Sequence, residues 1–184
     1  MKRVFIAIII ELSTELQQDW QQLKHKLGTE KVRWVPSENF HITLRFLGSI
    51  SEEQEKQVQN CILQACNNQP AFSFELGNFS YFKRRGKPVV VFVDLQKIEE
   101  LTELATQINE SLKNVGFEAI QKFRPHLTLG RIKHLKDESV FFEVMNNFKE
   151  THVQHIDVKE VILYESILHP EGPEYKIIQS FELN

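Results

Sequence analysis

The sequence predicts an α+β fold with two similar lobes. Segments of strand and helix character follow each other as strand, helix, strand, helix, strand in the first half of the 184 residues, and the second half repeats this order. His41-Ile42-Thr43-Leu44 in the first half is matched by His126-Leu127-Thr128-Leu129 in the second, at an offset of 126 − 41 = 85 residues. We therefore expect two lobes related by a pseudo-two-fold axis, with one polar motif in each.

The chain begins with a buried strand and an amphipathic helix. Residues 3–10 are an apolar, β-branched run that suits a strand and is too short to span a membrane, and no signal-peptide cleavage site follows it. Ser13 is a suitable helix N-cap, and Gly28 can end the helix in a left-handed conformation. The apolar face of this helix comprises Leu16, Trp20, Leu23 and Leu27.

Two further strands and a second helix follow. Residues 32–35 can form a short strand, and residues 40–46 alternate between polar and apolar side chains until Gly48 ends the pattern. Ser51 and Gln54 form a capping box for the second helix. Its apolar stripe comprises Val58, Cys61, Ile62, Ala65 and Cys66.

The second half repeats these elements. After a strand at 71–79, the expected segments are a strand at 88–94, a helix at 98–112 closed by Gly116, a strand at 124–132, a short helix at 137–148, strand-like runs at 153–168 and a last strand at 175–183. Adding 85 maps Val4 onto Val89 and Leu16 onto Leu101, so the repeat extends beyond the polar motifs. We treat residues 1–184 as one domain with an internal duplication, whose approximate halves 1–85 and 86–184 form the two lobes.

Composition and charge limit the classes of protein. With 41% hydrophobic and 26% charged residues, the chain can bury a sizeable core, and its net charge of −3 gives no general attraction to nucleic acid or anionic lipid. Any polyanion must therefore be bound by a local patch. Cys61 and Cys66, on different faces of a predicted helix, offer no disulfide framework. We expect a cytoplasmic protein with no membrane partner.

The paired motifs offer groups for acid and base catalysis. On a strand, residues i and i+2 point the same way, so His41 lies beside Thr43 and His126 beside Thr128. A pseudo-two-fold axis can bring the two imidazoles to opposite sides of one small substrate. Displacement at phosphorus suits that arrangement, because a neutral imidazole can deprotonate water while a protonated one donates to the leaving oxygen.

Two other interpretations of the histidines are simpler. A single His-x-Thr on a strand usually reflects β propensity, but two copies at matching places in two similar halves favour an active site. A zinc cluster has little support, because His152 and His155 fall on opposite faces of a predicted strand and the remaining histidines are scattered. We expect no metal and no other cofactor.

Both motifs carry a family resemblance. Residues 40–48, Phe-His-Ile-Thr-Leu-Arg-Phe-Leu-Gly, and residues 123–131, Phe-Arg-Pro-His-Leu-Thr-Leu-Gly-Arg, closely resemble the twin motifs of the 2H phosphoesterases. The opening Arg-Val-Phe-Ile-Ala-Ile, the size and the motif spacing are similar to the bacterial and archaeal RNA 2′,3′-cyclic phosphodiesterases, formerly called 2′-5′ RNA ligases. The resemblance covers essentially the whole chain.

This resemblance implies a structure and an activity. The fold would be bilobal, with an antiparallel-rich sheet in each lobe, helices on the outer faces and a central cleft. The enzyme would open a terminal 2′,3′-cyclic phosphate of RNA to a 2′-phosphate without a metal, and some members also join tRNA halves reversibly through 2′-5′ bonds. By motif position, His41 is the proton donor, His126 the proton acceptor, and Thr43 and Thr128 bind phosphate.

Basic residues near the motifs are candidates for RNA contact. Arg45 shares the face of His41, whereas alternation puts Arg131 on the face opposite His126, so that Arg131 reaches the phosphate only if the strand ends or twists there. The family resemblance nevertheless favours Arg131 as a phosphate ligand. Further candidate contacts with the RNA backbone are Arg124 and the cations Lys83, Arg84 and Arg85 of an expected hairpin loop. Phe5, Phe46 and Tyr81 are expected in the core.

Three functions remain open from the residues. They are a phosphodiesterase acting on RNA ends, a 2H enzyme acting on a small cyclic nucleotide or related phosphodiester, and an RNA-binding module without activity. The intact histidines argue against the third, and the basic loop favours RNA over a small nucleotide. No heptad or exposed apolar stripe requires a partner subunit, so we expect a monomer.

Overall fold

The computed structural model describes residues 1–120, 122–148, 151–170 and 172–184. Its strands are β1 (Lys2–Ile9), β2 (Lys31–Trp34), β3 (His41–Ile50), β4 (Phe72–Arg84), β5 (Lys87–Gln96), β6 (Leu127–His134), β7 (Gln154–Val158), β8 (Glu160–Leu168) and β9 (Pro173–Glu182). Its helices are α1 (Thr14–Lys26), α2 (Glu52–Asn67), α3 (Glu99–Asn114) and α4 (Glu138–Asn147), with a 3₁₀ turn at Ser37–Asn39. The α+β prediction is confirmed.

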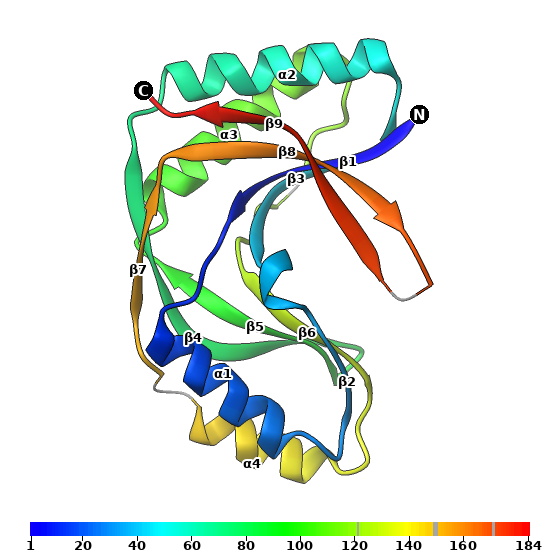
Figure 1. Cartoon of the computed structure of the whole chain (residues 1–184), viewed down its shortest axis with the longest axis vertical. Helices are drawn as coiled ribbons and strands as arrows, with labels where there is room; N and C mark the ends of the chain where they lie inside the picture. Colours follow the sequence, from blue (N-terminus) through cyan, green and yellow to red (C-terminus); the bar gives the residue numbers. More distant parts are fainter. Residues whose placement is uncertain (121, 149–150, 171) are drawn as a thin grey trace.

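The nine strands form one antiparallel sheet that divides at its centre. Its order is β7-β4-β5-β6-β3-β1-β8-β9, and β2 pairs with the remaining part of β6. The two central strands, β3 and β6, share a single paired position, Ile42 with Leu127. The sheet therefore separates into two lobes that meet where the two motifs begin (Figure 1).

The two lobes do not coincide with the two halves of the sequence. One lobe contains β3, β1, β8 and β9 with α2 against them, and the other contains β6, β5, β4 and β7 with α1 and α4 at its end of the molecule (Figure 1). The boundary expected near residue 85 falls in the tight turn between β4 and β5, which pair with each other. The run at 153–168 is two strands in different lobes, because β7 pairs with β4 and β8 pairs with β1 and β9.

The interleaved lobes still follow a regular correspondence. Moving outward from the centre, β3 corresponds to β6, β1 to β5, β8 to β4 and β9 to β7. Adding 85 to Lys2–Ile9 gives 87–94, within β5, and adding 85 to Thr14–Lys26 gives 99–111, within α3. An internal duplication stays a prediction. Each of its repeat units would contribute strands to both lobes.

Local signals place the helix starts well. The Ser13 hydroxyl accepts a hydrogen bond from the Leu16 N–H at 3.2 Å, and both bonds of the Ser51–Gln54 capping box are present. Gly116 closes α3 with a φ of +94°, as expected. Gly28 does not adopt the expected left-handed conformation: α1 ends at Lys26, and the chain continues in further turns in which the Gly28 N–H donates to the His25 carbonyl at 3.1 Å and the Glu30 N–H to the Leu27 carbonyl at 2.9 Å. No helix in the described part of the chain is long and apolar enough to cross a membrane.

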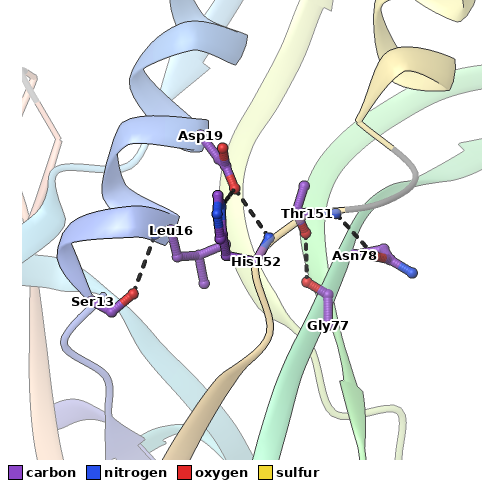
Figure 2. Close-up of polar contacts among 7 residues, drawn as sticks. All are labelled: Ser13, Leu16, Asp19, Gly77, Asn78, Thr151 and His152. Carbon is purple, nitrogen blue, oxygen red and sulfur yellow. Dashed lines mark hydrogen bonds and ion pairs between the residues drawn. The ribbon is translucent and has the colours of Figure 1, made fainter.

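Hydrogen bonds join α1 to the segment before β7, and that segment to β4 (Figure 2). The Asp19 carboxylate lies 3.1 Å from the backbone N–H of His152 and 2.8 Å from its Nδ1, and the Thr151 hydroxyl donates to the Gly77 carbonyl at 3.0 Å. These bonds join α1, β4 and the segment before β7. His152 therefore has a structural role.

The buried side chains form two clusters. One cluster of buried side chains runs through both lobes and includes Ile6, Leu16, Leu101 and Phe141; Cys61 and Cys66 are free and buried within it. A separate small cluster of Phe5, Ala7, Ile162 and Tyr164 lies on the other face of β1 and β8, with Tyr175 packed against it. Phe5 of this second cluster contacts the imidazole of His41.

Candidate active site

A cleft of about 900 Å³ lies where the two lobes meet. His41 and Thr43 enter it from the start of β3, and His126 and Thr128 enter it from the start of β6. His126 itself precedes β6, which begins three residues later than expected, at Leu127. The structure thus brings all four motif side chains together.

Both imidazoles are held by the same local hydrogen bond. His41 Nδ1 lies 2.7 Å from the Asn39 carbonyl, and His126 Nδ1 lies 2.8 Å from the Arg124 carbonyl, two residues earlier in each case. A carbonyl oxygen only accepts, so each Nδ1 carries the hydrogen. Each Nε2 is consequently the ring nitrogen available to exchange a proton.

Aromatic rings surround each imidazole. The ring centroid of His41 lies 5.0 Å from that of Phe5 and 5.3 Å from that of Tyr175, which is perpendicular to it. His126 is contacted by Phe82 at 4.9 Å and Phe92 at 5.6 Å, both nearly edge-on. These rings restrict the imidazoles and shield part of each from bulk water.

Burial lowers the pKa of both histidines below the ordinary value. The carbonyl bond at Nδ1 opposes this effect in each case, whereas the positive charge of Arg131 adds to it. The charge of His126 also lowers the pKa of His41, so protonation of one ring disfavours protonation of the other. The site therefore favours one neutral and one protonated imidazole over two protonated ones.

A β-bulge brings Arg131 into the cleft. On β6, Thr128 faces Phe92 and Gly130 faces Val91, so Leu129 is an extra residue without a partner on β5. The bulge shifts the alternation by one position, and Arg131 lines the cleft together with Thr128. The expectation from strict alternation was therefore wrong for this residue: β6 does not end here but continues to His134, and the bulge is what brings Arg131 to the cleft.

The same bulge occurs in the other motif. On β3, Thr43 faces Ala7 and Arg45 faces Ile6, so Leu44 is the extra residue, and 44 + 85 = 129. As a result Phe46, expected in the core, lines the cleft with 65% of its surface exposed. β3 also continues past Gly48 to Ile50. Phe5 is buried as expected, and Tyr81 is half-buried against Phe141.

Arg45 is not presented on an open surface. It is 8% exposed, and its Nη2 donates to the carbonyl of Glu118 in the segment between α3 and β6. Its Nε and Nη1 have no hydrogen-bond partner among the described residues, although the side chain borders the cleft. Arg45 therefore supports the segment that carries Lys122 and Arg124 along the cleft.

The remaining basic residues divide into two groups. Arg124 lines the cleft, and its guanidinium lies 5.1 Å from the ring centroid of Phe82. Lys83 and Arg84 end β4, and Arg85 with Gly86 forms the expected hairpin turn with φ values of +51° and +81°. These three cations do not belong to the described lining of the cleft. Contact of any of them with RNA stays a prediction.

The cleft contains residues that sequence reasoning missed. Arg33 and Trp34 come from β2, Lys122 from the segment before β6, Lys133 from β6, and His169 and Tyr175 from the β8–β9 hairpin. Arg33 is paired in register with Arg131 across β2 and β6. No local pattern marks these positions, because strand pairing across the lobes brings them to the cleft. In the described part of the chain, no group of three or more His, Cys, Asp or Glu side chains is arranged to hold a metal.

Comparisons with known proteins agree with this architecture. A family model described as the 2′-5′ RNA ligase superfamily matches residues 12–167. A protein of Archaeoglobus fulgidus named RNA 2′,3′-cyclic phosphodiesterase is 32% identical over 98% of this chain and 99% of its own length. One of the same name from Thermotoga maritima is 30% identical over 96% and 92%.

Solved structures share the fold. Thermus thermophilus TT0787 superposes with a TM-score of 0.79 at 23% identity, covering 98% of this chain and 97% of that one. E. coli LigT in complex with 3′-AMP gives a TM-score of 0.73 at 24% identity, covering 100% and 98%. The bilobal α+β arrangement is therefore shared with both proteins.

Proposed function

The chain belongs to the 2′-5′ RNA ligase superfamily and is a phosphoester hydrolase, and from this premise we propose that it opens the terminal 2′,3′-cyclic phosphate of RNA. The product is a 2′-phosphomonoester with a free 3′ hydroxyl. His41 and His126 supply the acid and the base without a metal. Curated relatives that are 25–32% identical over most of their length carry the name of this activity.

One observation carries the proposal. Two imidazoles from different lobes enter one cleft, and each has its Nδ1 hydrogen bonded to a carbonyl two residues earlier. Both Nε2 atoms are thereby prepared for proton exchange. Histidines with only a structural role are not expected to show the same arrangement in both lobes.

The reaction is a single displacement at phosphorus. The neutral Nε2 of His126 takes a proton from water as the water oxygen forms a bond to phosphorus. The bond from phosphorus to the 3′ oxygen breaks, and the protonated Nε2 of His41 donates its proton to that oxygen. Afterwards His126 is protonated and His41 neutral, and exchange with solvent restores the starting state. The assignment of donor and acceptor follows the family resemblance.

Three side chains are suited to hold the phosphate. Thr43 and Thr128 lie beside the two imidazoles and line the cleft, and their hydroxyls can donate to the non-bridging oxygens. Arg131 adds a guanidinium, which can bind two phosphate oxygens at once. All three groups are neutral or positive, as an anionic transition state requires.

The surroundings favour RNA over a small cyclic nucleotide. Lys122, Arg124 and Lys133 line the cleft together with Arg131, although the whole chain has a net charge of −3. Phe46 offers an exposed aromatic ring, which is suited to a nucleobase. A cleft of about 900 Å³ has room for more than the cyclic phosphate itself. tRNA halves as substrate, a monomeric state and a cytoplasmic location stay predictions.

The proposal extends to ligation by the same chemistry. If the 5′ hydroxyl of a second RNA takes the place of water, the same bond formation at phosphorus and loss of the 3′ oxygen give a 2′-5′ phosphodiester. Reversal of the two proton transfers cleaves that bond. Whether joining or hydrolysis dominates depends on whether the 5′ hydroxyl of the second RNA or water reaches the phosphorus.

The test compares two substrates and identifies the product. We expect faster turnover, measured as kcat/KM, on an oligonucleotide ending in a 2′,3′-cyclic phosphate than on a 2′,3′-cyclic mononucleotide. Phosphorus NMR of a dinucleotide product should show the 2′-phosphate. A product that is mainly the 3′-phosphate would mean that the donor and acceptor roles of His41 and His126 have to be exchanged or abandoned. No turnover of either substrate would refute the proposed function.

A further inference from the structure

A third element besides the two motif strands reaches the catalytic histidines. The β8–β9 hairpin places Tyr175, which pairs in register with Ser166, on the wall of the cleft. The ring of Tyr175 meets the imidazole of His41 at a centroid distance of 5.3 Å and an angle of 90°. It also rests edge-on against Phe5, which is buried beneath both rings.

The aromatic rings that contact the second histidine in the described part of the chain carry no hydroxyl. His126 is contacted by Phe82 and Phe92, which are purely apolar rings. The Tyr175 ring beside His41, by contrast, carries a hydroxyl and lines the cleft. The two histidines thus share their hydrogen bonding to the backbone but differ in the aromatic rings that contact them.

The charge around Tyr175 favours an anionic ligand. Burial raises the pKa of its hydroxyl above the ordinary value, while the nearby charges of Arg131, Arg3 and Arg33 oppose that rise. The phenol therefore stays protonated near neutral pH and can donate a hydrogen bond. Because Arg131 and His41 both line the cleft next to it, an anion that contacts these two residues comes within reach of Tyr175.

The hairpin that carries Tyr175 is braced from the opposite lobe. A Cβ atom at Gly172 would lie only 2.8 Å from Arg33 Nη2, so the guanidinium on β2 rests against the hairpin backbone. Within the hairpin, His169 and Gly172 exchange two backbone hydrogen bonds of 3.1 Å, and His169 Nε2 lies 2.9 Å from the Glu174 carboxylate. These contacts hold Tyr175 in place across the cleft.

We propose that Tyr175 is a further substrate-contacting residue, whose hydroxyl donates a hydrogen bond to an oxygen of the reacting phosphate on the side of His41. This inference rests on the proposed function for the identity of the substrate. It makes the site chemically asymmetric, because the side of His41 has the Tyr175 hydroxyl in addition to Thr43, whereas Phe82 and Phe92 contact His126 on the side of Thr128.

The test removes the hydroxyl and keeps the ring. Tyr175→Phe should lower kcat/KM on an oligonucleotide ending in a cyclic phosphate roughly 10- to 100-fold, as expected for the loss of one hydrogen bond to a charged group. The pH at which kcat/KM is highest should not change, because the phenyl ring still packs against His41. The variant should also bind 2′-AMP, a small analogue of the product, more weakly by calorimetry.

Tyr164→Phe is the matched control. Tyr164 is 7% exposed, stacks on Phe5 at 5.2 Å with its ring 6.4 Å from that of Tyr175, and does not belong to the described lining of the cleft. Its loss of a hydroxyl should leave kcat/KM and 2′-AMP affinity unchanged. An equal fall in both variants would assign the effect to packing of the aromatic cluster and would overturn the proposal.

Two results separate this proposal from the proposed function. If wild-type enzyme opens the cyclic phosphate and Tyr175→Phe matches it within twofold in kcat/KM and in 2′-AMP affinity, the proposal for Tyr175 is wrong and the function stands. If wild-type enzyme is inactive on the oligonucleotide but 2′-AMP binding still depends on the hydroxyl, the function is wrong and the phosphate contact stands.

Discussion

Replacing either cleft histidine by asparagine separates proton transfer from structural support. Nδ1 of His41 donates to the Asn39 carbonyl and Nδ1 of His126 to the Arg124 carbonyl. The side-chain amide of asparagine has N–H donors that can make the same bond, but it has no nitrogen that titrates near neutral pH. His41→Asn and His126→Asn therefore remove the proton-transfer group and retain the hydrogen bond that fixes the side chain.

The expected loss follows from the role of each ring. General acid or base catalysis contributes ~10²- to 10⁴-fold, so kcat should fall by that factor in each variant, or about 3–5 kcal/mol of barrier. The double variant should lose less than the product of the two factors, because acid and base act in one displacement. Loss of ring contacts with Phe5 or Phe82 should cost about 0.5–3 kcal/mol of stability, which a domain with about 5–15 kcal/mol tolerates.

The assay measures kcat at saturating cyclic-phosphate oligonucleotide and thermal unfolding of each variant. His155→Asn is the control, since His155 lies on β7 outside the described lining of the cleft, with its Nδ1 3.6 Å from Glu75. Its activity should match that of wild type. A folded His41→Asn or His126→Asn variant with activity within tenfold of wild type would refute the two-histidine mechanism.

Three more outcomes follow from the geometry. Because burial lowers the pKa of both His41 and His126, the bell-shaped profile of kcat/KM, which reports the free enzyme, should be centred below about pH 6.5; a centre at or above pH 7 would contradict this. Thr43→Val and Thr128→Val each delete one hydroxyl and should cost about 0.5–1.5 kcal/mol in kcat/KM, more if the bond tightens in the transition state; a loss equal to that of the histidine variants would make the assigned role wrong. Activity should survive exhaustive EDTA treatment, because imidazoles supply the acid and the base; loss with chelator and recovery with one added metal would show a metal requirement.

Signals that act over a few residues were predictable from the sequence. Ser13 and the Ser51–Gln54 pair start helices where expected, because a cap is satisfied by N–H groups two or three residues away. The Arg85–Gly86 turn is also local, since two positive φ values suffice to close the hairpin. The polar motif was found for the same reason, as alternation on a strand fixes which side chains share a face.

Partners that are distant in the sequence were not predictable in the same way. Each half of the chain contributes strands to both lobes, and the sequence pattern of β1 does not reveal that it pairs with β8. Tyr175 reaches His41 only through that pairing and the pairing of β8 with β9. Residues of the site that lie outside the two motifs were missed for this reason.

The bulges explain both the failure of alternation and the chemistry of the cleft. An extra residue follows each threonine, Leu44 on β3 and Leu129 on β6, and each turns the residue two positions further on into the cleft. Those residues, Phe46 and Arg131, occupy equivalent places, since 46 + 85 = 131, yet one offers an aromatic ring and the other a guanidinium. The backbone therefore places two identical acid-base groups, while the positions two residues after the bulged leucines differ. A nucleotide is asymmetric in the same sense, with a base at one end and a phosphate at the other, so the difference at these two positions is what would orient it between the histidines.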